Sequence, residues 1–141
     1  MRSSKPLVVV KGAGDLATGV AYRLHRVGFA VVLTEMQGRH RPGRGWIEGA
    51  LARRPMGVIA VFSDLSETMR EQLRTRGIPF VVVDPAGEPL HDTPSIGATN
   101  WNGGLTATRH LLGLGHRLIG VVGGPAGVLC SRARVDGFRA A

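Results

Sequence analysis

The residues of this chain that are best suited to chemistry lie in a glycine-rich turn near its N-terminus. Gly12, Gly14 and Ala17 follow the apolar run Leu7–Lys11 and match the spacing G-x-G-x-x-G/A. The first glycine of that pattern permits a tight turn, the second lets a pyrophosphate approach the backbone, and the third position keeps a helix close to a sheet. Glu35 follows the next apolar run, where a carboxylate would bind a ribose hydroxyl. The spacing is therefore typical of a site for an NAD-type dinucleotide cofactor.

The same turn has a second interpretation, as a plain connection between a strand and a helix. Such a connection needs glycines whether or not a ligand binds. Asp15 would place a carboxylate at the helix start, where it stabilises the helix dipole but competes with a bound phosphate. A P-loop is excluded, because Val20 and Ala21 stand where Lys and Ser/Thr would be required after Gly14 and Gly19. We prefer the structural interpretation and keep dinucleotide binding as an alternative.

The remaining reactive side chains form no recognisable catalytic or metal site. The five histidines lack the spacing of metal ligands, and no serine lies in a G-x-S-x-G turn. Cys130 is the single cysteine, which excludes an internal disulfide and a cysteine-rich metal site. The sequence therefore does not indicate an enzyme, and we expect no bound metal.

The formal net charge of +8 in 141 residues raises the question of nucleic-acid binding. The densest basic patch lies in a Gly/Pro-rich loop and consists of Arg39, His40, Arg41 and Arg44. No helix-turn-helix, zinc-finger or RNA-binding motif accompanies it, so we predict a solvated basic surface and no specific nucleic-acid partner. No apolar run approaches the roughly 20 residues that span a bilayer, and the start of the chain lacks the apolar core of a secretion signal. We expect a cytoplasmic protein without a membrane partner.

Short β-branched runs alternate with helical patterns along the chain. The runs predict buried parallel strands over Leu7–Lys11, Ala30–Thr34, Gly57–Phe62, Phe80–Asp84 and Leu118–Val122, with a short strand over Ser95–Ala98. The helical patterns cover Asp15–Val27, Trp46–Arg53, Ser66–Arg76, Thr99–Leu114 and about Ser131–Ala141. This alternation predicts a single α/β domain over residues 1–141. Its fold class would be a three-layer α/β/α sandwich with a parallel five-stranded sheet, in the flavodoxin-like or Rossmann-like order 2-1-3-4-5 or close to it.

Two stretches of the chain resemble two different families. Residues 7–36, LVVVKGAGDLATGVAYRLHRVGFAVVLTEM, resemble the Rossmann-type N-terminus of the family that matures selenium-dependent molybdenum hydroxylases. Residues from about 38 to 141, with FVVVDP, GATNWNGG, HLLGLGHRLIGVVGGP and CSRARVDGF, resemble the periplasmic-binding-protein-like effector domain of LacI/GalR transcriptional regulators. The resemblance changes near Glu35–Arg39, in the turn after the second predicted strand, where one βαβ unit could replace another. We therefore predict a chimera, engineered from two donors.

The resemblance to the regulators implies a second candidate site. Asp84, at the end of its predicted strand, and Arg134, in the segment CSRARVDGF, match positions that contact a small effector, often a sugar or nucleobase, in a cleft between two subdomains. A carboxylate that accepts hydrogen bonds and a guanidinium that donates them suit a polyol. Most of the second subdomain would lie beyond Ala141, so we expect weak binding. The alternative, which we prefer, is that Asp84 caps a turn before Pro85 and that Arg134 is an exposed helical arginine.

These observations lead to one main prediction and two alternatives. The main prediction is an engineered scaffold without catalytic activity, with a vestigial small-molecule site at the carboxyl ends of its strands. The first alternative is a dinucleotide-binding module that uses Gly12, Gly14, Ala17 and Glu35. The second is an effector-binding fragment of a LacI-type regulator that lacks its DNA-binding head. A homodimer is a further expectation, because regulator domains of this kind dimerise and an incomplete second subdomain would expose apolar surface.

Overall fold

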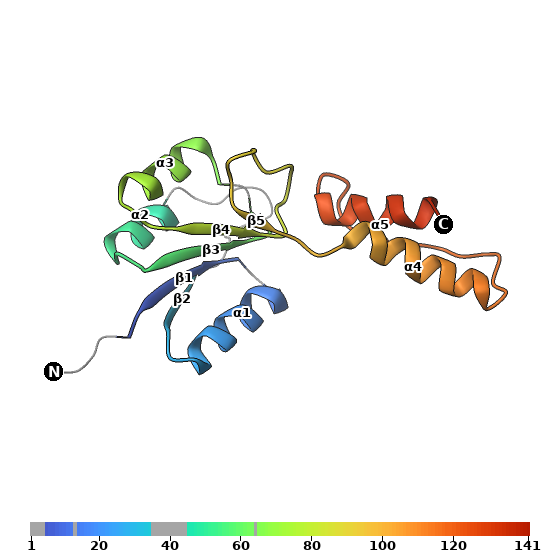
Figure 1. Cartoon of the computed structure of the whole chain (residues 1–141), viewed down its shortest axis with the longest axis horizontal. Coiled ribbons are helices and arrows are strands. Elements are labelled where there is room, and N and C mark those ends of the chain that lie inside the picture. Colours follow the sequence, from blue (N-terminus) through green and yellow to red (C-terminus); the bar gives the residue numbers. More distant parts are fainter. Residues whose placement is uncertain (1–4, 13, 35–44, 64) are drawn as a thin grey trace. The chain divides into compact units, whose positions relative to one another are not determined.

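The computed structural model describes residues 5–12, 14–34, 45–63 and 65–141 of the chain. Its strands are β1 (Leu7–Lys11), β2 (Ala30–Thr34), β3 (Gly57–Val61), β4 (Phe80–Val83) and β5 (Ser95–Ile96). Its helices are α1 (Gly14–Arg26), α2 (Gly45–Ala52), α3 (Glu67–Thr75), α4 (Asn100–Gly113) and α5 (Leu129–Arg139), as Figure 1 shows. The chain divides into two compact units, Met1–Val83 and Asp84–Ala141, which we call the first and the second unit. The prediction of one domain over 1–141 stays a prediction, and each unit is described by itself.

The strands follow the order β2-β1-β3-β4-β5, which confirms the predicted fold class. The first four pair in parallel, with Val9 opposite both Val32 and Val58, and Ala60 opposite Val82. These strands are rich in β-branched residues, whose stiff side chains fit a pleated surface that is covered on both faces. The predicted bounds of β1 and β2 agree with the structure, and the predicted ends of β3, β4 and β5 agree within two residues.

Alternate residues of the strands in the first unit build two separate cores. Val9, Val58 and Ala60 point to one face, where they pack with residues of α2 and α3 such as Ile47 and Leu73. On the other face, Val8, Val10 and Val61 pack with Ala17 of α1. Figure 1 shows α1 on one side of the strands and α2 with α3 on the other. The first unit therefore has the three layers that the alternation predicts. The residues of these cores are fully or nearly fully buried.

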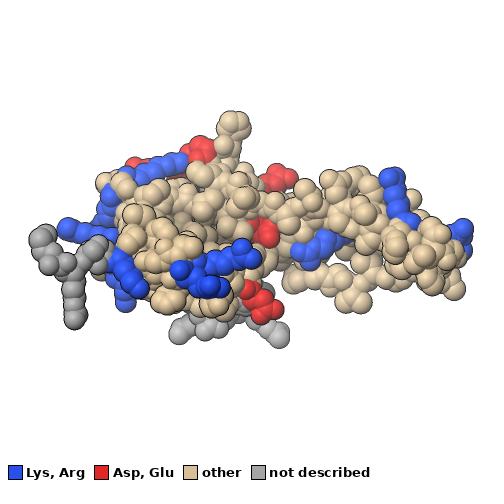
Figure 2. Space-filling model, turned by 60° about the horizontal axis from the view of Figure 1, so that its bottom comes forward, with Lys and Arg blue, Asp and Glu red and all other residues tan. Residues whose placement is uncertain are grey.

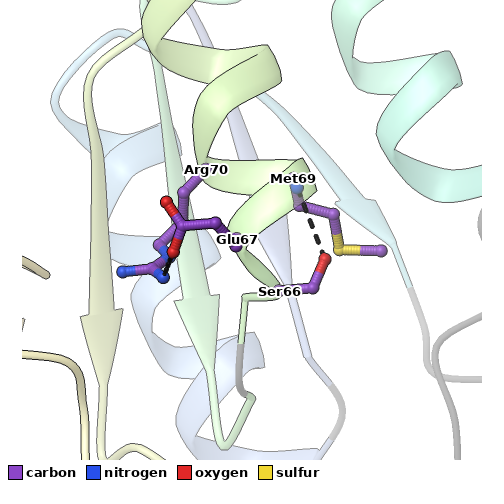
Figure 3. Close-up of polar contacts among 4 residues, drawn as sticks. All are labelled: Ser66, Glu67, Met69 and Arg70. Atoms are coloured by element: carbon purple, nitrogen blue, oxygen red, sulfur yellow. Dashed lines mark hydrogen bonds and ion pairs between the residues drawn. The ribbon is translucent and has the colours of Figure 1, made fainter.

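Helix α3 begins at a capped turn. Ser66 has an extended backbone, and its Oγ accepts a hydrogen bond from the N–H of Met69 at 3.3 Å. Such a cap satisfies one of the donors that the first turn of a helix leaves unpaired. Within the same turn Glu67 forms an ion pair with Arg70, as Figure 3 shows. The cap fixes where α3 begins and hence how Leu73 enters the core.

The predicted strand Leu118–Val122 is wrong, since this segment is neither helix nor strand. The side chains of Leu118 and Val122 are 100% and 101% exposed. A strand forms only where a neighbouring strand accepts and donates its backbone hydrogen bonds. Within the described part of the chain, no strand pairs with this segment. The fifth strand of the sheet is instead the two-residue β5, inside the short strand predicted over Ser95–Ala98.

The second unit is built mainly on the packing of α4 against α5. Glycines allow the two helix backbones to approach closely. A Cβ placed on Gly137 of α5 would lie 2.0 Å from the carbonyl oxygen of Trp101, and one placed on Gly104 of α4 would lie 2.2 Å from that of Arg134. Only glycine fits at such distances. No helix in the described ranges is long and apolar enough to cross a membrane.

Candidate functional site

The glycine-rich turn after β1 is packed tightly by the chain itself. Gly12 has a φ of +151°, and its N–H donates a hydrogen bond to the carbonyl oxygen of Thr34 at 3.0 Å. A Cβ at this position would lie 2.9 Å from the Cβ of Val61 and 3.3 Å from that of Ala17. Ala17 is itself completely buried. Glycine is therefore required here by the fold, which favours the structural interpretation of the motif.

The other members of the dinucleotide motif lie partly outside the described residues. Gly14 begins α1, and Asp15 is exposed in the first turn of that helix. Glu35, the predicted ribose ligand, falls outside the described ranges. The structure thus brings Gly12, Gly14 and Ala17 together at the start of α1, while dinucleotide binding stays a prediction.

A buried lysine at the end of β1 was not predicted from the sequence as a site residue. Lys11 is 1% exposed, its Nζ donates a hydrogen bond to Ser63 Oγ, and the ammonium lies 4.8 Å from the ring centroid of Trp46. The ring face and the hydroxyl both stabilise the ammonium, and they offset part of the free-energy cost of its desolvation. The Oγ1 of Thr34, opposite Lys11 in the sheet, is buried without a hydrogen-bond partner among the described residues. The only sequence signal for this cluster is a cation that ends a β-branched run.

The carboxylate of Asp84 holds the loop that follows β4. Its Oδ1 accepts a hydrogen bond from the N–H of Ala98 at 3.0 Å, and its own N–H donates to the carbonyl oxygen of Ile96 at 2.8 Å. The residue has a φ of +46°, a conformation that aspartate tolerates better than most residues. Both bonds fix the strand-end position of Asp84 relative to β5. The observed bond spans the loop to Ala98, so the predicted cap of a turn before Pro85 stays a prediction.

Arg134 is exposed on α5 and reaches the start of α4. Its Nε donates a hydrogen bond to Asn100 Oδ1 at 2.8 Å, and Asn100 Nδ2 in turn donates to the carbonyl oxygen of Ala98 at 3.1 Å. Because Asp84 binds the N–H of the same Ala98, a continuous chain of hydrogen bonds joins the two predicted effector residues. We call Asp84, Ala98, Asn100 and Arg134 the polar relay. Asn100, its central member, was not predicted from the sequence.

Two cavities of the second unit meet at the polar relay. One, of about 430 Å³, is lined by Asp84, Asn100, Asn102 and Trp101 and otherwise mostly by apolar surface. The other, of about 550 Å³, is lined by Asn100 and Arg134 and otherwise mostly by apolar side chains. Both volumes lie in the range of small-molecule sites. The relay therefore presents acceptors to one cavity and a guanidinium to the other.

The distribution of basic side chains can be followed on one face of the molecule (Figure 2). On the face shown in Figure 2, Lys and Arg side chains do not gather into one patch and stand among acidic ones. The predicted densest patch, Arg39 to Arg44, falls outside the described residues. The absence of a specific nucleic-acid partner therefore stays an expectation.

Comparisons with known proteins match almost the whole chain to one family. The family model of periplasmic binding proteins and the sugar-binding domain of the LacI family matches residues 14–141. The transcriptional repressor PurR of Vibrio parahaemolyticus is 30% identical over 128 residues, which are 90% of this chain and 38% of the repressor. Among solved structures, a LacI-type regulator from Alkaliphilus metalliredigens in complex with D-xylulofuranose matches with a TM-score of 0.72 and 19% identity, over 94% of this chain and 51% of that one. The Lac repressor bound to ONPG matches with a TM-score of 0.73 and 19% identity, over 99% of this chain and 44% of that one.

These matches bear on the predicted chimera and on the length of the chain. The family match begins at residue 14 and continues through Glu35–Arg39, where the resemblance was expected to change. The comparisons support the regulator resemblance, but they give no support to a Rossmann-type donor or to an engineered junction. The chain spans 38% of the length of the curated relative and about half of the solved ones. The structure and the match over residues 14–141 together place this chain in the family of periplasmic binding proteins and LacI-type sugar-binding domains.

Proposed function

We propose that this chain is the effector-binding part of a LacI/PurR-type regulator and that its second unit binds a small polyhydroxylated molecule at the polar relay. The observation that carries the proposal is the continuous series of hydrogen bonds from Asp84 through Ala98 and Asn100 to Arg134. This series holds an acceptor and a donor in fixed positions at two adjoining cavities. Fixed polar groups in a mostly apolar cavity are what orients a small ligand.

The chemistry of the relay suits a sugar. Asp84 is a pure acceptor, while Arg134 offers donors in a fixed plane, and its terminal nitrogens form no hydrogen bond with described residues. Asn102 adds an amide that both donates and accepts. Trp101 lines the same cavity and is 45% exposed, so its ring is accessible to the apolar face of a pyranose or furanose. Hydroxyl groups need partners of both kinds, and the relay supplies them.

The relatives support this class of ligand. Solved members with a similar fold carry D-xylulofuranose, cellobiose or ONPG in their descriptions. Each is less than 25% identical to this chain, so they support a sugar-like effector only as a class. A dinucleotide has weaker support, because the space beside Gly12 is filled by Val61 and Ala17.

Calorimetric titration of the chain with D-xylulose, D-xylose and cellobiose tests the proposal. For a sugar that binds, we expect Arg134→Ala to lower the affinity about tenfold or more, because a ligand hydroxyl loses a charged donor. Arg132→Ala is the matched control, since Arg132 is exposed on the same helix and lies outside both cavities. Equal affinity of the wild-type chain and Arg134→Ala would remove the relay from the site. A loss of affinity in both variants would point to a general charge effect.

A further inference from the structure

The buried lysine at the end of β1 lies where the order of the strands reverses. In the order β2-β1-β3-β4-β5, the chain passes from β1 outwards to β2 and then returns across β1 to β3. Lys11 is the last residue of β1, and Ser63 follows β3, which pairs with β1. Open α/β sheets bind ligands beyond the carboxyl ends of their strands at such a reversal. The hydrogen bond from Lys11 Nζ to Ser63 Oγ joins two strand ends at this point.

Lys11 is also unusual in its composition and its burial. Only two of the 18 lysine and arginine residues of the chain are lysines, and the other one, Lys5, is exposed. Lys11 is 1% exposed, and lysine side chains are almost never buried to this extent without a binding partner or a function. Its burial costs free energy, of which the ring of Trp46 and the hydroxyl of Ser63 offset a part.

Two polar atoms beside this lysine are buried and have no hydrogen-bond partner among the described residues. The first is the indole Nε1 of Trp46, which can only donate and which belongs to the ring beneath the Lys11 ammonium. The second is the hydroxyl of Thr34, which lies opposite Lys11 in the sheet. Buried donors are normally hydrogen-bonded, so each exception requires an explanation. An acceptor that binds at this place would satisfy both donors.

The three side chains come together on one face of the sheet. Lys11 and Thr34 each follow, by two residues, a valine that packs into the core beneath α2 and α3, and alternate residues of a strand share a face. Trp46, in the first turn of α2, packs against the same core. The turn at Gly12 packs instead on Ala17 of α1, which belongs to the core of the other face. The cluster is therefore separate from the predicted dinucleotide motif.

We propose that the first unit binds a small oxyanion, the phosphate or carboxylate group of a ligand, at Lys11, Thr34 and Trp46. An oxyanion accepts several hydrogen bonds at once, so the indole N–H and the threonine hydroxyl can both donate to it. The neighbouring ammonium favours an acceptor with negative charge over a neutral one, and this preference is strong where water is excluded. The site lies within the first unit and does not depend on the polar relay. It therefore goes beyond the function proposed above.

NMR titration of the whole 141-residue chain tests this site, with potassium phosphate replacing potassium chloride at constant ionic strength. The two indole N–H signals are assigned with Trp101→Phe. We expect the Trp46 signal to move downfield and to saturate at millimolar phosphate, because its N–H gains an acceptor. The Trp101 signal should stay in place. A parallel titration with potassium acetate distinguishes a site for carboxylates from one for phosphate alone, and saturation by either anion supports the proposal.

Three variants connect the titration to the proposed residues. Lys11→Met should weaken phosphate binding at least about tenfold, because it removes the ammonium and keeps a side chain of similar length in the core. Thr34→Val removes only the hydroxyl and should weaken binding about threefold. Lys5→Met is the matched control, since it removes the same charge from an exposed position of the same unit and should leave the titration unchanged.

Thermal unfolding provides a readout that is independent of the indole signal. Phosphate should raise the melting temperature of the wild type and of Lys5→Met more than that of Lys11→Met, because a ligand that binds only the folded state stabilises it. If Lys11→Met does not fold, Thr34→Val carries the comparison. A dispersed spectrum in which neither anion moves the Trp46 signal would overturn the proposal. Identical titration curves for the wild type and the folded variants of Lys11 and Thr34 would also overturn it.

Discussion

The two units of this chain contain similar elements but stabilise them differently. In the first unit, four parallel strands share their hydrogen bonds, and helices cover both faces of the sheet. In the second unit, α4 and α5 contact each other backbone to backbone at Gly104 and Gly137, while Leu118 and Val122 remain in solvent. An apolar β-branched run is buried in one unit and exposed in the other. The difference shows that such a run acquires its structure from its neighbours and not from its own composition.

The N-terminal capping of the helices also differs between the two units. In the first unit, α3 is capped by the side chain of Ser66. In the second unit, α4 follows Thr99 and α5 follows Val128, and neither residue makes a side-chain capping bond. The helices of the second unit therefore depend more on their mutual packing than on their own termini. Substitutions that act on packing or on capping should separate the two units.

The largest effect is expected for Gly12→Val in the first unit. The new side chain would collide with Val61 and Ala17 and would force a β-branched residue to a φ of +151°. Strain and overpacking together should lower the free energy of unfolding of this unit by about 4 kcal/mol. Urea unfolding followed by circular dichroism measures the loss.

Gly19→Ala is the control for that substitution. Gly19 lies in α1, the helix that follows the turn, and a Cβ there would meet no atom within 4 Å. Helix propensity alone should then stabilise the unit by about 0.5–1 kcal/mol. Equal effects of the two substitutions would show that the turn after β1 is not tightly packed.

The next largest effect is expected for Gly137→Ala in the second unit. The added methyl group would lie 2.0 Å from the carbonyl oxygen of Trp101, so α4 and α5 must separate. We expect a net destabilisation of about 2 kcal/mol, because overpacking exceeds the gain in helix propensity. Limited proteolysis between α4 and α5 should accelerate, while hydrogen exchange in the first unit stays unchanged. The same substitution at Gly113, where a Cβ meets nothing within 4 Å, should leave proteolysis as it is.

The smallest effect is expected when the capping difference between the units is reversed. Ser66→Ala should destabilise α3 by about 1 kcal/mol, because the N–H of Met69 loses its acceptor. Val128→Thr keeps the shape of the side chain and adds a hydroxyl at a position with cap-like backbone angles, so it should stabilise α5 by about 0.5 kcal/mol. Thermal unfolding curves of both variants provide the comparison. A stabilising Ser66→Ala would contradict the assigned cap.

The strands of the first unit could be predicted because each is marked by a local run of β-branched residues. Leu7–Lys11 and Ala30–Thr34 are short β-branched runs, and both are strands with the predicted bounds. Leu118–Val122 has the same local pattern, and the prediction failed because the pairing partner of a strand is not encoded in the strand itself. Local pattern and available partner are separate requirements.

Of the polar relay, only the two terminal residues, Asp84 and Arg134, could be predicted from the sequence. Asp84 and Arg134 were singled out by their resemblance to regulator positions, and their ligand contacts stay predictions. Asn100 links them through side-chain and backbone bonds between residues far apart in the sequence, which no local spacing reveals. Lys11 was missed for a related reason. A lysine at the end of a strand usually reaches solvent, and only the folded chain shows it enclosed by Ser63 and Trp46.

Each unit contains one tryptophan, so the fluorescence of that residue can report the state of its own unit. Trp46 packs against the core of the first unit with an ammonium over its ring, whereas Trp101 lies in the second unit at the edge of a cavity. The chain has no other indole. Replacing Trp101 by phenylalanine therefore leaves an emission spectrum that reports the first unit alone, and replacing Trp46 leaves one that reports the second unit. The molecule thus carries one built-in optical probe for each of its two parts.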